Sequence, residues 1–172
     1  MQTTIEGFQN LEPEEIDVLL EAPVLITILV GAADGELDRE ERTWSERLLH
    51  ARTYNNPKEL NGFYRAVVDN FEGKLQREMT HLPKDAAARN EALTPRLERL
   101  NGVLAKLDLE LAADLYKGFI GLAEETAKAS GGFLRIGGIG AEESKWIKLP
   151  MLTPIVSAKK NGENEAAKED SW

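Results

Sequence analysis

The chain has 172 residues, 42% of them hydrophobic and 30% charged, and it contains no cysteine. This length suits one domain with a sizeable core, and the lack of cysteine excludes disulfides and thiolate metal sites. The net charge is −9, and residues 1–50 carry all of this excess, with 12 acidic and 3 basic side chains. Because that surface would repel phosphate, we expect a cation or a basic partner there and no nucleic acid.

Neither a secretory signal nor a membrane-spanning segment is expected. The first twelve residues have no basic region followed by an apolar one. The longest apolar run, residues 24–30, is far shorter than the roughly 20 residues that cross a bilayer. We therefore expect a cytoplasmic protein that does not span a membrane.

The N-terminal part predicts two helices separated by proline. Pro13 suits the first position of a helix, with acidic residues in its first turn. Pro23 should break or kink this helix near Ala22. Residues 24–33 are apolar nearly all round and predict a buried helix, which Gly35 should end.

The next segment predicts a charged helix followed by a strongly amphipathic one. Asp38 and Glu41 stand three apart, as a capping box does at the start of a helix. The inner face of this helix should hold Trp44, Leu48, Leu49 and Ala51. Apolar residues then recur at spacings of three and four over residues 60–79, which predicts one amphipathic helix that ends before Pro83.

The C-terminal half continues as helices. Residues 84–107 are helical in composition, and Pro95 should kink or split them. Asp108 should cap a long helix in which Gly118 and Gly121 permit a close approach of neighbouring helices. A glycine-rich loop follows, then a short helix from Glu142 that stops at Pro150. Since no segment alternates apolar and polar residues, the class is all-α, a bundle of about seven helices.

Two short stretches of the chain resemble each other. Residues 40–44 and 142–146 both read Glu-Glu-x-x-Trp, and Ala-Asp-Gly at 33–35 is matched by Ala-Ser-Gly at 129–131. Each stretch follows an apolar helix and leads into a helix with a tryptophan expected to face inward. The pattern predicts two pseudo-symmetric helical-hairpin halves.

The first motif, Ala-Asp-Gly-Glu-Leu-Asp-Arg-Glu-Glu at residues 33–41, with its weaker copy from 130 to 143, resembles the TerB-like tellurite-resistance family. The resemblance spans roughly residues 13–150. It implies an all-helical, cytoplasmic, stress-associated domain with suspected metal binding and no established enzymatic activity. The second copy departs from the family because Ser130 stands in place of the acidic residue. A metal site that needs acidic residues from both copies is therefore not supported by the second one.

The acidic residues between 34 and 41, here called the acidic corner, are the best candidate site in the sequence. Carboxylates are the hard oxygen ligands that Ca²⁺ and Mg²⁺ prefer, and residues 34–41 around Gly35 carry five of them, four of which are candidate ligands. Capping and solvation explain part of this cluster without a ligand, and the spacing is not that of an EF-hand. The candidate metal ligands are Asp34, Glu36, Asp38, Glu41, Glu142 and Glu143.

Two other patterns resemble known sites without completing them. The glycine-rich residues 131–140 lack the Gly-Lys of a P-loop and the third glycine of a dinucleotide fingerprint. Glu78 and His81 form half of a di-iron bundle signature whose second copy is missing. No cofactor-binding or catalytic residues are predicted from either pattern.

These observations predict a single TerB-like helical domain over residues 1–156 and a polar tail over residues 157–172. The expected function is non-enzymatic binding of a protein partner, with a divalent cation at the acidic corner. Two alternatives stay open: a small metal-dependent enzyme that uses the same carboxylates, and a purely structural helical scaffold.

Overall fold

The structure is a computed structural model that describes residues 5–33, 37, 39–54, 58–129 and 141–157. The side chains of residues 40, 41, 58, 59 and 141–143 are not described. Seven helices and no strand occur within these ranges, which confirms the predicted all-α class. The helices are α1 (Pro13–Gly31), α2 (Arg39–Arg52), α3 (Lys58–Val68), α4 (Phe71–His81), α5 (Ala86–Leu104), α6 (Leu109–Ala127) and α7 (Ala141–Ile147).

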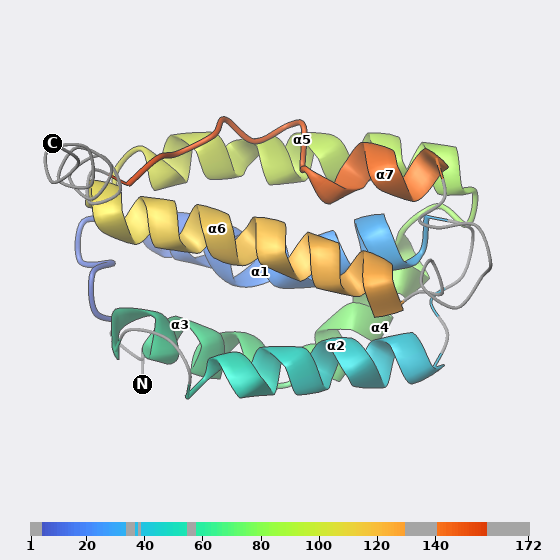
Figure 1. The fold of residues 1–172 in the computed structure, drawn as a ribbon, viewed down its shortest axis with the longest axis horizontal. Coiled ribbons are helices and arrows are strands. Elements are labelled where there is room, and N and C mark those ends of the chain that lie inside the picture. The colour runs from blue at the N-terminus through green and yellow to red at the C-terminus, as the bar shows by residue number, and fades with distance from the viewer. Residues whose placement is uncertain (1–4, 34–36, 38, 55–57, 130–140, 158–172) are drawn as a thin grey trace, which may run out of the picture.

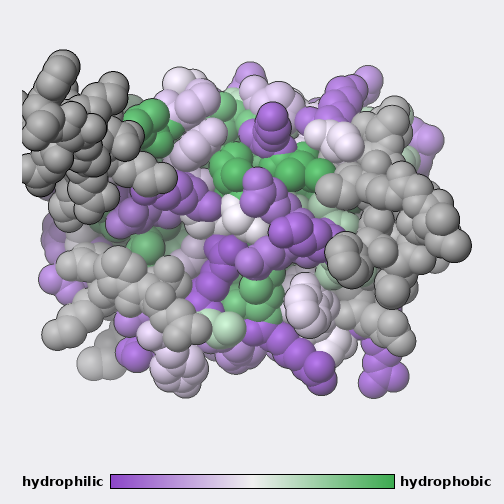
Figure 2. Space-filling view, viewed as in Figure 1, coloured by the Kyte–Doolittle hydropathy of each residue, from purple (hydrophilic) through white to green (hydrophobic). Residues whose placement is uncertain are grey.

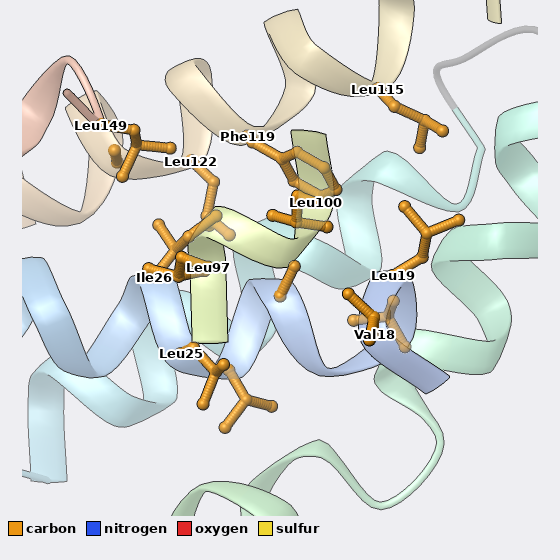
Figure 3. Close-up of a cluster of buried hydrophobic side chains, with 14 of the residues drawn as sticks. Val18, Leu19, Leu25, Ile26, Leu97, Leu100, Leu115, Phe119, Leu122 and Leu149 are labelled. Atoms are coloured by element: carbon orange, nitrogen blue, oxygen red, sulfur yellow. The ribbon is translucent and has the colours of Figure 1, made fainter. Parts of the chain in front are cut away.

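Helix α1 lies at the centre of the bundle. It packs against α3, α4, α5, α6 and α7, and every residue from Ala22 to Gly31 is buried. Figure 1 shows α1 and α6 in the middle, with α5 and α7 on one side and α2, α3 and α4 on the other. Leucine side chains of α5 and α6 converge on α1 together with Leu149, which follows α7 (Figure 3).

Neither proline splits its helix. Pro23 lies inside α1 and Pro95 lies inside α5, so the split that the sequence allowed is wrong at both sites, and the kink that it also allowed stays a prediction. Each proline removes one backbone hydrogen bond, which costs about 3 kcal/mol in an exposed helix. Burial of the surrounding apolar side chains outweighs this cost, and the Thr27 hydroxyl donates to the Pro23 carbonyl oxygen at 2.8 Å.

The single helix predicted over residues 60–79 is in fact two helices. Asn70 has φ 56°, in the left-handed region, and separates α3 from α4. Asparagine tolerates this conformation better than most residues because its short side chain can bond to nearby backbone. The apolar stripe continues across the break, since Val67, Phe71 and Leu75 are all buried.

Helix α2 confirms half of its predicted inner face. Leu49 is buried and Leu48 is partly buried against the core, as expected, but Trp44 is 50% exposed and Ala51 is also exposed. The buried positions beside Leu49 are Ser45 and Thr53, one turn away on either side. Because the inner face of this polar helix contains few apolar residues, hydrophobic spacing alone misplaced Trp44 and Ala51.

The two predicted hairpins can be followed in Figure 1. Helices α1 and α6 run in the same direction, and α2 and α7 return on opposite sides of them. The tryptophans do not share one environment, because Trp146 is partly buried against the core while Trp44 is half exposed. The predicted pair of inward tryptophans was therefore wrong for the first hairpin.

Gly118 permits the close approach that the sequence predicted. The backbone carbonyl oxygen of Gly118 accepts a hydrogen bond from Arg52 Nη1 at 2.6 Å, and the same nitrogen donates to the Tyr64 hydroxyl at 3.2 Å. A Cβ atom on Gly118 would lie 2.4 Å from that hydroxyl oxygen. One arginine thereby joins α2, α3 and α6 at a point where only glycine fits.

Two glycine-to-alanine substitutions should have opposite effects on stability. Gly102→Ala in α5 meets no atom within 4 Å, so we expect about 0.5–1 kcal/mol of stabilisation from helix propensity. Gly118→Ala should be destabilising by about 1 kcal/mol, because displacing Tyr64 outweighs the same gain. Urea denaturation of both variants measures this difference, and equal stabilisation by both would refute the close contact.

Candidate functional site

The predicted acidic site lies mostly outside the described residues. Asp34, Glu36 and Asp38 are not described at all, while Glu41 in α2 and Glu142 and Glu143 in α7 are described by their backbone only. The proposed set of metal ligands therefore stays a prediction. Among the residues with described side chains, no group of three or more histidine, aspartate or glutamate residues could hold a metal ion.

The helix starts that carry these residues lie at the same end of the bundle. Figure 1 shows α2 and α7 beginning there in different outer layers, with α1 and α6 between them. The first motif thus adjoins the end of α1, and the second motif adjoins the end of α6. That side chains from the two helix starts reach a common ion stays a prediction.

A buried arginine lies at the base of the acidic corner. Arg89 of α5 is 1% exposed, and its guanidinium donates to the carbonyl oxygens of Ala32 and Lys84. Ala32 is the C-cap of α1, so this positive charge lies at the negative end of the α1 dipole. The chain therefore supplies its own cation two residues before Asp34.

Sequence reasoning missed Arg89, although the spacing contained a signal. Arg89 lies four residues before Leu93, and Leu97 and Leu100 continue the same buried face of α5. A charged residue that continues an apolar stripe is rarely left unpaired in a core. This spacing could have marked Arg89 as a buried structural cation.

A small cavity adjoins the same corner. Its volume is about 300 Å³, and apolar side chains of Leu37, Leu75 and Met79 form part of its wall. The ionisable side chains that line it, within the described part of the chain, are Arg42, Lys84 and Arg89. The described ionisable lining of this cavity is therefore basic.

Two neighbouring hollows lie along α1 and are together called the α1 groove here. One, of about 820 Å³, lies between the N-terminal segment, α1 and α3, and the other, of about 300 Å³, lies between α1 and α4. Asp17, Leu20 and Lys74 line both hollows. The floor is apolar and includes Ile16 and Ala66, each partly buried.

An ion-pair network closes one end of the α1 groove. Arg96 of α5 donates to Glu78 of α4 at 2.6 Å and to Glu21 of α1 at 3.2 Å. The hydrogen bond with Glu78 raises the pKa of Arg96, so the guanidinium stays charged. The ion pair with Arg96 gives Glu78 a partner that is not a metal. His81, the other residue of the di-iron pattern, has its Nδ1 2.7 Å from the Arg77 carbonyl oxygen.

Figure 2 shows another face of the bundle, which carries α2, α6 and α7. Most of this face is hydrophilic, with apolar patches along the seams between the helices. No helix in the described ranges is long and apolar enough to cross a membrane.

No protein family, curated protein or solved structure matches this chain. The TerB-like resemblance therefore stays a prediction that rests on the motif at residues 33–41.

Removal of the buried guanidinium should weaken the fold. Arg89→Leu leaves two carbonyl oxygens without their charged donor, and we expect a loss of about 2–4 kcal/mol in the free energy of unfolding. Arg99→Leu is the matched control, because Arg99 is exposed on the same helix and should change stability by about 0.5 kcal/mol or less. Urea denaturation compares the two, and similar values for both would contradict a structural role for Arg89.

Proposed function

We propose that this chain is a non-enzymatic, TerB-like helical domain that acts by binding a protein partner in the α1 groove. The observation that carries the proposal is the groove itself, a long open hollow with an apolar floor and charged walls. Sites that bind proteins combine an apolar centre with a polar rim in this manner. The partly buried Leu20 lies where the two hollows meet and is the natural centre of contact.

The two resolved pKa shifts belong to groups held in ion pairs. The pKa of Glu15 is lowered, mainly by its hydrogen bond with Lys106, and that of Arg96 is raised by Glu78. Both shifts move away from neutrality and keep the groups charged.

A divalent cation at the acidic corner is the second element of the proposal. The spacing of Asp34, Glu36, Asp38 and Glu41 in the sequence supports it. A metal-dependent enzyme built on the same carboxylates is the alternative function. It predicts metal-dependent turnover of ester or phosphoester substrates, which the binding proposal does not.

Partner binding can be tested by photo-crosslinking in cells that express the full chain. A benzophenone amino acid in place of Leu20 should give a discrete crosslinked adduct, because this side chain faces the groove. The same residue in place of Lys117, on α6, is the control and should give none. Equal labelling from both positions, or from neither, would count against the groove as the binding surface.

The cation element can be tested by thermal melting with Ca²⁺ or Mg²⁺. An ion at 100 times its Kd should stabilise the folded state by about 2.7 kcal/mol, and Asp34→Asn combined with Asp38→Asn should abolish the shift. If neither ion changes the melting temperature of the wild type, the cation element fails. The crosslinking at Leu20 tests the α1 groove independently of that result.

A further inference from the structure

The α1 groove has the length of a short helix. The α1 residues that line it run from Pro13 to Leu25, about 18 Å at 1.5 Å per residue. This distance corresponds to roughly three helical turns in a partner. An apolar stripe of four side chains, spaced three and four residues apart, would cover such a floor.

On the α3 side, the floor of the α1 groove is lined by two small residues. Gly62 and Ala66 lie one turn apart on α3, and both border the groove. A Cβ atom on Gly62 would lie 3.8 Å from the Ile5 side chain, an ordinary van der Waals contact, so this position is small but not empty. Small residues let two helix backbones approach closely, which favours a helix as the occupant.

The two walls of the groove carry opposite charges. Asp17 and Glu21 lie on the α1 wall, and Arg65, Lys74 and Arg77 lie on the wall formed by α3 and α4. The acidic residues of the second wall are Asp69 and Glu78. Arg96 pairs with Glu78 and also with Glu21 of the first wall, so Asp17 is the main acidic group that the first wall presents. The groove therefore presents an acidic side and a mainly basic side to whatever occupies it.

A helix fits this groove better than an extended peptide does. An extended peptide binds by adding a strand to an open sheet edge or by lying in an aromatic-lined groove. The walls here are helices, whose backbone groups are bonded internally, and Phe8 is the one aromatic residue that lines the hollow among described side chains. Side-chain contacts are then the main source of affinity, as in helix-in-groove recognition.

We propose that the α1 groove binds an amphipathic α-helix of a partner protein, roughly 12–15 residues long, with basic residues on one flank of its apolar stripe and acidic residues on the other. The basic flank faces Asp17, and the acidic flank faces Lys74 and Arg77. Since these pairings fix the direction of the helix, the groove selects for orientation as well as for charge. This inference rests on the proposed binding function and adds the chemistry of the partner.

The test uses three synthetic fluorescent helices that share one apolar stripe and differ in their flanks. One has a lysine flank and a glutamate flank, one has lysine on both flanks, and one has glutamate on both. Fluorescence anisotropy with the full chain should show that the mixed helix binds at least about ten-fold more tightly than either of the others. The preference should weaken as salt is raised.

Charge reversal on one wall should change the order of affinities. Lys74→Glu combined with Arg77→Glu makes both walls acidic, so the helix with two lysine flanks should become the tightest ligand. Lys117→Glu combined with Lys128→Glu, on α6, is the matched control and should leave the order unchanged. Circular dichroism melts check that both variants fold.

The outcomes separate this inference from the proposed function. If the three helices bind equally, or if the wall reversal leaves their order unchanged, the charge-patterned helix is refuted. A partner captured at Leu20 with no helix binding would preserve the binding function and overturn this inference alone. Self-association in sedimentation that Leu20→Glu abolishes would assign the groove to a second copy and would also overturn it.

Discussion

The fold depends on the burial of one helix from all sides. Helix α1 has no polar face over its second half, so it cannot lie on a surface. Burial of each large apolar side chain is worth about 1.5–3 kcal/mol, which is enough to keep Pro23 inside a continuous helix. The other helices are arranged to cover α1, and the short α7 with Leu149 completes that cover.

The two ends of α1 lie in different surroundings. At the C-terminal end the last carbonyl groups need donors inside the core, and Arg89 donates one hydrogen bond there, to the carbonyl oxygen of the C-cap Ala32. At the N-terminal end α1 becomes amphipathic, with Ile16 and Leu20 only partly covered. The buried cation and the open groove thus follow from the same helix, one at each end.

Much of this fold could be predicted from local signals, and the parts that could not be predicted depend on distant contacts. Asp108 was expected to cap α6, and its side chain accepts hydrogen bonds from the backbone of Glu110 and Leu111. The possible splits at Pro23 and Pro95 did not occur because helix propensity is a local quantity and does not include the stabilisation from tertiary burial. Trp44 was placed inward because an aromatic residue in a polar helix has no local mark of exposure. The groove escaped prediction because it forms between α1, α3 and α4, which only the folded chain brings together.

The charge distribution has a different meaning once the helices are known. The −9 of the first fifty residues pointed to the acidic corner, yet seven of its twelve acidic residues lie outside residues 34–41. Glu12 and Glu15 form the capping box of α1, and Glu15 also pairs with Lys106. Glu21 pairs with Arg96 at the edge of the groove. Helix capping and ion pairs therefore account for part of the charge that had favoured a cation, and the case for an ion rests on the few carboxylates between α1 and α2.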